Sequence, residues 1–279
     1  MVPLSSAEAS APCRGSSRAR RSGKAVPFGV MSDSESLESD VSGGARLVEE
    51  LRVSGEWDEP EVRTRCLELL EREGACVLTQ VVDKRVLEEV REAVEPTLQR
   101  IAERLEEDGQ NLSEEVKNEF GLVRAPPVGD GKTNVHFDEY ESPEHGAMER
   151  LARQSRFEDI VSSYIGRPCT LYEAGASITT PGGEGMEWHR DGTEGEVTVL
   201  MSLSNVEADQ GQLGVIPRSH KGAKLEKLKD EELTAADDDK AVWYSYRAGC
   251  PMIIDARTQH SVRDNVSQDK RCILWYIYN

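Results

Sequence analysis

The chain has 279 residues, of which 37% are hydrophobic, and its formal net charge is −18 at pH 7. This length suits one sizeable domain with tails, and so negative a charge argues against a nucleic-acid partner, because most faces would repel phosphates. No apolar run approaches the roughly 18 residues that a membrane span needs, so we expect no membrane span.

The N-terminal residues 1–44 are predicted to lie outside the folded domain. Residues 1–31 are rich in Ser, Ala, Arg and Pro, with five basic residues and one acidic residue, and an acidic, serine-rich linker follows them. The composition fits a disordered tail and an organellar transit peptide equally well. We therefore expect a cytoplasmic protein, or an organellar one if residues 1–31 are a transit peptide. Residues 45–279 are expected to form a single domain.

The six cysteines are scattered along the chain without a Cys-x-x-Cys pair. That pattern favours free thiols in a reducing compartment over a disulfide framework or a structural zinc site. No sequence feature indicates assembly, so we expect a monomer.

The first third of the domain has the periodicity of helices. Residues 58–74, "DEPEVRTRCLELLEREG", predict a helix with Pro60 in its first turn and Gly74 at its end. A short buried strand, "ACVLT", follows. Asp83 is then predicted to cap a long amphipathic helix, which Pro96 should kink.

The middle of the domain has weaker patterns. Residues 108–145 are polar and rich in Gly and Pro, and we interpret them as a loop with one short strand. In that loop, Asn134, His136 and Tyr140 are candidates for the mouth of a substrate site. Residues 145–166 predict a single amphipathic helix closed by a glycine.

From residue 169 onward the chain changes to short β-rich runs separated by Gly, Pro, Asn and Asp. They occupy residues 169–180, 195–206, 213–217, 241–249, 251–256 and 272–278. Helices followed by many short strands predict an α+β fold, in which a double-sheet barrel, a cupin-like jelly roll, follows supporting N-terminal helices.

The stretch "GMEWHRDG", residues 185–192, carries a histidine and an aspartate two positions apart. On a strand, His189 and Asp191 would share one face and offer two adjacent ligands to a divalent metal. A non-haem iron(II) site needs a third ligand and leaves positions open for other molecules. Among the remaining histidines we favour His260, because it directly follows a β-rich run.

Arg271 lies eleven positions after His260 and opens the last apolar run. A guanidinium buried inside a barrel needs an anion, and a dicarboxylic acid would satisfy it. The alternative for this arginine is an ion pair with Asp264 or Asp269 at the barrel rim.

Several motifs, in order from about Leu69 to the C-terminus, resemble the phytanoyl-CoA dioxygenase family of iron(II)/2-oxoglutarate oxygenases. They are "LEREGACVLTQVVDKRVLEEVREAV", "YIGRPCTLYEAGASITTPGGEGMEWHRD", "DQGQLGVIPRSHKGAK" and "RAGCPMIIDARTQHSVRDNVSQDKR". The last segment is similar to a family pattern with Asn, Ser and Arg at five, seven and eleven positions past a histidine. Together the motifs cover most of the chain after the N-terminal tail.

This resemblance implies a jelly-roll dioxygenase that uses Fe(II), 2-oxoglutarate and O2. By resemblance, His189, Asp191 and His260 are the metal ligands and the catalytic set, and Arg271 holds the far carboxylate of 2-oxoglutarate. Asn265 and Ser267 match the other two positions of the last pattern. They are candidate cosubstrate contacts, although such loop residues more often bond the local backbone.

The implied reaction is hydroxylation of a small organic or lipid-like substrate, with release of succinate and CO2. Relatives that halogenate lack the carboxylate ligand, so Asp191 favours hydroxylation. The acidic composition disfavours a polyphosphate ligand such as coenzyme A. Two alternatives remain open at this point: a non-catalytic jelly-roll binding module, and a cupin-like enzyme that uses another divalent metal.

The sequence departs from the family pattern at three positions. Arg218 replaces the usual glycine of "PGSH", Val262 replaces a residue that often carries a hydroxyl, and Thr180 replaces a common lysine. These departures concern the secondary contacts of the cosubstrate and the type of substrate, and they leave the metal triad unaffected.

Overall fold

The computed structural model describes residues 48–79, 81–108, 112–125, 127–139, 142–221 and 240–279. All of them belong to one unit, Glu38–Asn279. The predictions for the N-terminal tail concern residues outside these ranges and stay predictions.

A large, mostly antiparallel sheet forms one wall of the barrel. Within the described residues it has nine strands, of which β4 pairs only with β5 and β1 runs parallel to β2. In spatial order they are β1 (Arg52–Ser54), β2 (Ala75–Thr79), β11 (Met252–Asp255), β8 (Val197–Met201), β13 (Arg271–Tyr278), β6 (Leu171–Thr179), β5 (Lys132–Phe137) and β3 (Leu122–Arg124), with β4 (Pro127–Gly129) beside β5.

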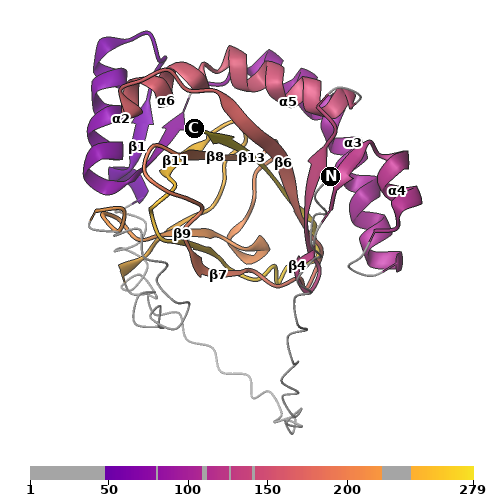
Figure 1. The fold of residues 1–279 in the computed structure, drawn as a ribbon. Coiled ribbons are helices and arrows are strands. Elements are labelled where there is room, and N and C mark those ends of the chain that lie inside the picture. The colour runs from indigo at the N-terminus through magenta and orange to yellow at the C-terminus, as the bar shows by residue number, and fades with distance from the viewer. Residues whose placement is uncertain (1–47, 80, 109–111, 126, 140–141, 222–239) are drawn as a thin grey trace, which may run out of the picture. The chain divides into compact units, whose positions relative to one another are not determined.

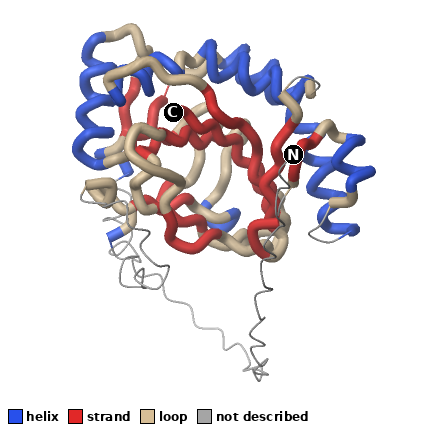
Figure 2. Tube along the Cα trace, viewed as in Figure 1, coloured by secondary structure: helices blue, strands red, loops and turns tan. Residues whose placement is uncertain are grey.

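A smaller antiparallel sheet forms the opposite wall (Figures 1 and 2). Its described strands, in spatial order, are β10 (Val242–Tyr244), β9 (Leu213–Val215), β12 (His260–Val262) and β7 (Met186–His189). Two facing sheets whose strands alternate along the chain make the predicted jelly roll, and the space between them is where a ligand fits.

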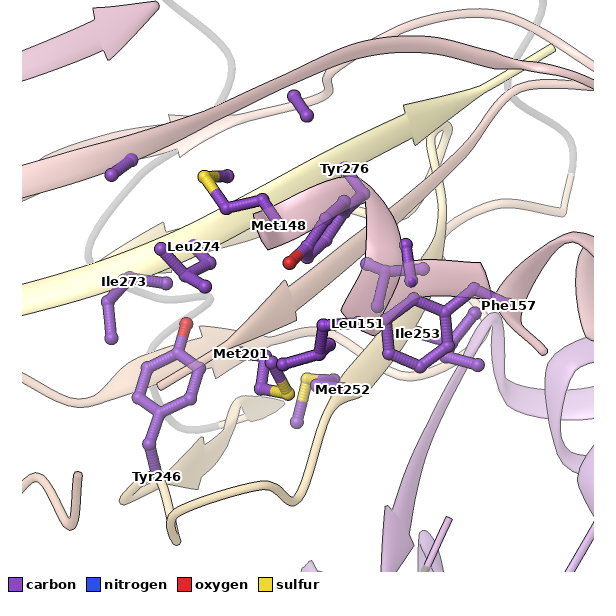
Figure 3. Close-up of a cluster of buried hydrophobic side chains, with 14 of the residues drawn as sticks. Met148, Leu151, Phe157, Met201, Tyr246, Met252, Ile253, Ile273, Leu274 and Tyr276 are labelled. Atoms are coloured by element: carbon purple, nitrogen blue, oxygen red, sulfur yellow. The ribbon is translucent and has the colours of Figure 1, made fainter. Parts of the chain in front are cut away.

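Helices cover the outer face of the large sheet (Figure 1). They are α2 (Pro60–Glu73), α3 (Lys84–Asp108), α4 (Glu114–Glu119), α5 (Pro143–Gln154) and α6 (Phe157–Ile165). Figure 3 shows Leu151 and Phe157 of this helical layer among Ile253, Leu274 and Tyr276 of the sheet. The rings of Phe157 and Tyr276 pack edge to face with centroids 5.7 Å apart. Burial of this layer is the main source of stability, since it removes apolar surface from water.

The expected elements at the start of the domain are confirmed. The first helix begins at Pro60 and ends at Glu73, and Gly74 closes it in the left-handed conformation, with φ 78°. The side chain of Asp83 accepts hydrogen bonds from the backbone N–H groups of Arg85 and Val86, so it caps α3 as predicted. The helix continues through Pro96 to Asp108.

Two expectations are wrong. Residues 108–145 are not one loop with a single strand, because they contain α4 and the strands β3, β4 and β5. In β5 the polar residues Lys132, Asn134 and His136 line the interior of the barrel, so the usual alternation of apolar-in and polar-out is reversed. The sequence pattern therefore resembled a loop.

The helix expected over residues 145–166 is two helices. Arg156 adopts a left-handed conformation, with φ 58°, and separates α5 from α6. Its guanidinium pairs with Asp159 and with Asp58. Apolar periodicity continues across this break, which is why the sequence does not reveal it.

Neither α3 nor any other helix in the described ranges has the length and apolar character that spanning a bilayer requires. All five cysteines within those ranges are free thiols, as expected.

The C-terminal end of α2 supports the turn between β11 and β12. The carbonyl oxygen of Gly74 accepts hydrogen bonds from the backbone N–H of Asp255 (2.9 Å) and from the hydroxyl of Thr258 (2.8 Å). A Cβ atom on Gly74 would lie 2.4 Å from both His220 Nδ1 and Thr258 Oγ1. This glycine therefore lets the helix end approach the segment that leads into His260.

We predict that Gly74→Ala destabilises the protein more than Gly166→Ala. Both glycines close a helix in the left-handed conformation, but a Cβ on Gly166 would meet nothing within 4 Å. Gly166→Ala should cost about 1–2 kcal/mol from backbone strain, and Gly74→Ala a further roughly 1–3 kcal/mol from overpacking. Urea unfolding of both variants measures the difference, and equal losses would contradict the close approach.

Candidate active site

The pairing of β7 with β12 brings two of the predicted metal ligands together. His189 and His260 are directly opposite each other in the antiparallel register, and their ring centroids are 4.1 Å apart. His189 is the last residue of its strand and His260 the first of its own. Both rings therefore project from adjacent strand ends at one point of the small sheet.

Both imidazole rings are held in the same way. His189 Nδ1 lies 2.8 Å from the carbonyl oxygen of Glu187, and His260 Nδ1 lies 3.0 Å from that of Thr258. A ring nitrogen that donates its proton to a backbone carbonyl leaves the other nitrogen unprotonated in the neutral ring. Both rings thus present Nε2 as a lone-pair donor, which is the orientation that metal-binding histidines adopt.

Asp191 follows β7 and completes the group. Its Oδ1 lies 3.5 Å from Nε2 of His189 and 3.3 Å from Nε2 of His260. Its Oδ2 accepts a 2.7 Å hydrogen bond from the hydroxyl of Thr198. The backbone N–H of Asp191 donates to the carbonyl of Ala256, which fixes the loop beside the β11–β12 turn.

In the described residues, His189, Asp191 and His260 form one group whose ligand atoms all lie within 4.8 Å of one another. Two imidazole nitrogens and one carboxylate oxygen on one side of a point are the donor set typical of non-haem iron(II) sites. The structure therefore brings together the three residues that the sequence predicted, and they fit a divalent metal.

Within this group, Asp191 and His260 each shift the pKa of the other toward its charged form. Burial raises the pKa of the Asp191 carboxyl, but the adjacent His260 and His189 outweigh it and hold that pKa well below its usual range. Burial lowers the pKa of His260, but the Asp191 carboxylate raises that pKa by more, so the net shift is upward. The aspartate is therefore an anion, available as a ligand, across the physiological pH range.

Arg271 lies at the start of β13, as predicted, and is 2% exposed. Its Nη1 donates to the carbonyls of Gln210 (2.9 Å) and Gly211 (2.7 Å), and Nη2 donates to the hydroxyl of Thr179 (2.9 Å). A Cβ on Gly211 would lie 2.0 Å from Nη1, so that position must be glycine. The structure thus assigns Arg271 to the barrel interior and not to an ion pair at the rim.

One edge of the Arg271 guanidinium remains available. Its Nε is buried and has no hydrogen-bond partner among the described residues. Since Nη2 has two protons and Thr179 takes one, Nε and Nη2 can together bind a carboxylate through two parallel hydrogen bonds. A buried cation with an open edge fits the far carboxylate of a dicarboxylic acid.

Lys132 of β5 is a second buried cation in this region that sequence reasoning missed. Like Arg271, it is opposite Thr179 in the sheet register, and it is 2% exposed. Burial, reinforced by the positive charge of Arg271, lowers the pKa of Lys132 to about 7. A bound carboxylate would relieve the repulsion between the two cations. The only sequence signal was a lysine inside a polar strand whose pattern resembled a loop.

A cavity of about 360 Å³ connects these groups. Nineteen residues line it, including the His189, Asp191 and His260 group, the two cations, and apolar residues of both sheets. Asn134 and His136, expected at a substrate mouth, line it as well, whereas Tyr140 lies outside the described residues. Sequence reasoning missed Glu173, Thr198, Tyr246 and Trp275 among the polar or aromatic lining residues.

The structure does not bring Asn265 and Ser267 to the cavity. Asn265 is buried and its Nδ2 donates to the carbonyls of Thr180 (3.2 Å) and Asp269 (2.8 Å). The hydroxyl of Ser267 donates to Oδ1 of Asn265. Both side chains thus stabilise the loop between β12 and β13, and neither lines the cavity. Their expected role as cosubstrate contacts has no support in this geometry.

The three departures from the family pattern have local explanations. Arg218 adopts a left-handed conformation, with φ 69°, where a glycine would be unstrained, and its guanidinium pairs with Glu73. The hydroxyl of Thr180 donates to the carbonyl of Gly131. Val262 lines the cavity and adds to its apolar wall.

The sequence and the fold were compared with known proteins. The family profile described as "Phytanoyl-CoA dioxygenase (PhyH)" matches residues 70–273. No curated protein sequence matches the chain significantly.

Several solved structures share the fold. The alpha-ketoglutarate-dependent epimerase SnoN from nogalamycin biosynthesis is 19% identical, with a TM-score of 0.55 over 79% of this chain and 84% of that chain. The carbocyclase SnoK from the same biosynthesis is 18% identical, with a TM-score of 0.57 over 76% and 81%. EctD from S. alaskensis, solved with 2-oxoglutarate and 5-hydroxyectoine, is 19% identical, with a TM-score of 0.52 over 77% and 75%.

We predict that Lys132→Met stabilises the ligand-free protein at pH 7. Replacing a buried cation that has a cationic neighbour by an apolar side chain of similar length should add about 1–4 kcal/mol to the free energy of unfolding. The gain should shrink from pH 7 towards pH 10. Over that range folded Lys132, with a pKa of about 7, has lost its proton, whereas the unfolded chain still binds it, so wild-type stability rises with pH.

Urea unfolding of both proteins at several pH values measures this effect. Lys117→Met is the control, because that lysine pairs with Glu114 at the surface. A loss of stability in Lys132→Met at every pH would show that the cation stabilises the fold and is not held there for a ligand.

Proposed function

Because this chain belongs to the phytanoyl-CoA dioxygenase family, we propose that it is a non-haem iron(II)- and 2-oxoglutarate-dependent dioxygenase that hydroxylates a small organic substrate. The observation that carries this proposal is the pairing of two sites in one cavity. His189, Asp191 and His260 offer a metal-binding group, and Arg271 offers an open guanidinium edge to a dicarboxylate.

The metal would be held by Nε2 of both histidines and by Oδ1 of Asp191. Glu187 and Thr258 fix the rings through their carbonyls, and Thr198 occupies the second oxygen of the aspartate. The carboxylate is thereby restrained to bind through one oxygen, which leaves coordination positions open for other molecules. Bound iron(II), with 2-oxoglutarate and oxygen, would supply the oxidising power for the reaction.

The cosubstrate would be oriented by the two buried cations. Arg271 would bind its far carboxylate through Nε and Nη2, and Lys132 would add a charge-assisted hydrogen bond. Binding a dianion would draw the proton onto Lys132, because an adjacent negative charge favours the charged amine. SnoN has been solved in complex with alpha ketoglutarate and EctD with 2-oxoglutarate, which is consistent with this role.

The remaining cavity walls would exclude water from the reacting centre. Leu200, Leu213 and Ile273 are among the apolar residues that line the cavity. An apolar lining strengthens the electrostatic contacts inside and protects reactive species from water. Asp191 keeps a carboxylate where halogenating relatives lack one, which favours hydroxylation as the reaction.

We expect the protein to form the visible charge-transfer chelate with iron(II) and 2-oxoglutarate under anaerobic conditions. Replacing His189, Asp191 or His260 by alanine should abolish the band, since each removes a metal ligand. Arg271→Gln should weaken 2-oxoglutarate binding about 10- to 100-fold, because it removes a charge-assisted bidentate contact. Titration followed by absorbance measures both effects.

His145→Ala and Arg263→Gln are the matched controls, since neither residue lines the cavity. Both variants should bind like the wild type. If iron binds and no band forms, the proposal fails, and a binding module or an enzyme that uses another divalent metal takes its place.

We also expect aerobic conversion of 2-oxoglutarate to succinate by the iron-loaded protein, at a slow rate without substrate. Asp191→Ala and Arg271→Gln should reduce the rate at subsaturating 2-oxoglutarate at least about tenfold. Chromatographic measurement of succinate tests this. A band without any succinate would mean that the chelate forms and the oxygenase reaction does not follow.

A further inference from the structure

The cavity also has a second end, which is lined by residues that are neither proposed metal ligands nor proposed cosubstrate contacts. Inward-facing residues of β13 alternate from Arg271 through Ile273 and Trp275 to Ile277. Trp275 lies four positions after Arg271 on β13, which is about 13 Å along the strand. The two buried cations lie at the first position, while Glu173, His136 and Arg124 line the cavity near the last two.

Trp275 is the central residue of this second end. It is 7% exposed, it lines the cavity, and its indole N–H has no hydrogen-bond partner among the described residues. An unsatisfied buried donor is costly and uncommon in folded proteins. Because an indole nitrogen can only donate, the missing partner must be a hydrogen-bond acceptor.

The position of the indole is fixed from two sides. Trp275 lies opposite Gly175 in the β13–β6 register, and a Cβ on Gly175 would lie 2.3 Å from Cζ2 of the ring and 2.4 Å from the carbonyl oxygen of Val135. The ring of His136 packs edge-on against the indole, with centroids 4.9 Å apart. The indole of Trp275 is therefore a rigid platform, and it can occupy this position only because residue 175 is a glycine.

The charges around this platform are balanced. Glu173 forms an ion pair with Arg124, and its Oε1 lies 2.8 Å from Nδ1 of His136. Burial lowers the pKa of His136, which favours the neutral ring. The second end thus carries one positive and one negative charge, in contrast to the two cations at the first end.

From these observations we infer that Trp275, with Glu173, recognises the substrate, and that the substrate is a small molecule without net charge that carries a carbonyl or hydroxyl oxygen. The substrate oxygen accepts a hydrogen bond from the indole N–H, and the body of the molecule lies against the indole and His136. Glu173 accepts a hydrogen bond from an O–H or N–H group of the substrate. This inference rests on the proposed function and names the substrate class of that reaction.

Size and charge both disfavour a coenzyme A thioester. The cavity of about 360 Å³ is near the lower limit of the roughly 300–1,000 Å³ found for ligand pockets, and the cosubstrate shares it. The cation beside Trp275, Arg124, already pairs with Glu173 and offers no free charge to a polyphosphate. A neutral or zwitterionic molecule matches both properties.

The indole N–H resonances of the protein provide a test that does not need the substrate in advance. The sequence has four tryptophans, so the spectrum is simple, and the peak missing from Trp275→Phe identifies Trp275. The iron site is filled with zinc and 2-oxoglutarate. The probes are the sixteen common amino acids that have no net charge at pH 7, 2-pyrrolidinone and methyl glucoside, with octanoate and octanoyl-CoA as the anionic set.

We expect at least one neutral or zwitterionic probe to shift the Trp275 peak downfield and the anionic set to leave it unchanged. The same probe should stimulate succinate formation by the iron enzyme. Trp275→Phe should lower kcat/KM for that probe about 5- to 100-fold, the loss expected for one buried hydrogen bond, with no change in the KM for 2-oxoglutarate.

Trp243→Phe is the matched control. That indole packs against Gly214 and Arg263 on the small sheet and does not line the cavity, so the same change there should leave kcat/KM unaltered. Glu173→Gln should retain folding and strengthen octanoate binding, because it leaves Arg124 without its anion.

The inference is overturned if the anionic set alone shifts the Trp275 peak, if no probe shifts it, or if Trp275→Phe and Trp243→Phe have equal effects on kcat/KM. A normal chelate band in those cases would leave the proposed function standing. Absence of the band in the wild type would instead remove the proposed function itself.

Discussion

The antiparallel register of β7 and β12 is the constraint on which the site depends. It places His189 opposite His260, and a slip of one residue would turn one of the rings to the outer face of the small sheet. The register is in turn supported from outside the sheet. The carbonyl oxygen of Thr258 accepts from the ring of His260, and its hydroxyl donates to the carbonyl of Gly74 at the end of α2. The helical layer therefore helps to position a candidate metal ligand through Thr258.

The interior of this barrel is polar at a cost to stability. Arg271 and Lys132 are both buried, one on each side of Thr179, and carbonyl and hydroxyl groups satisfy only part of the guanidinium. Buried like charges oppose folding, and the apolar layer between the large sheet and its helices offsets them. Such an arrangement is expected where a dianion binds, because the ligand supplies the missing charge.

The two ends of the cavity differ in what they recognise. One end has two cations and an open guanidinium edge, which suits a dicarboxylate whatever the substrate is. The other end has a fixed indole and a balanced ion pair, which suits a small molecule without net charge. Arg271 of the first end lies in a segment that resembles the family pattern. The second end depends on Gly175, Trp275 and Glu173, and residues of this kind decide which substrate a shared fold accepts.

By itself the sequence determined the α+β class and most of the strands after residue 169, because those features lie in local motifs and apolar runs. It also singled out His189, Asp191, His260 and Arg271 as candidates, and the structure places all four around one cavity. It failed at β5 and at Lys132, because a strand that faces a polar cavity shows no apolar alternation. It also placed Asn265 and Ser267 near the cosubstrate, while their hydrogen bonds hold a loop. Only the tertiary structure decided these points, since which face of a strand meets the cavity depends on pairing between segments far apart in the chain.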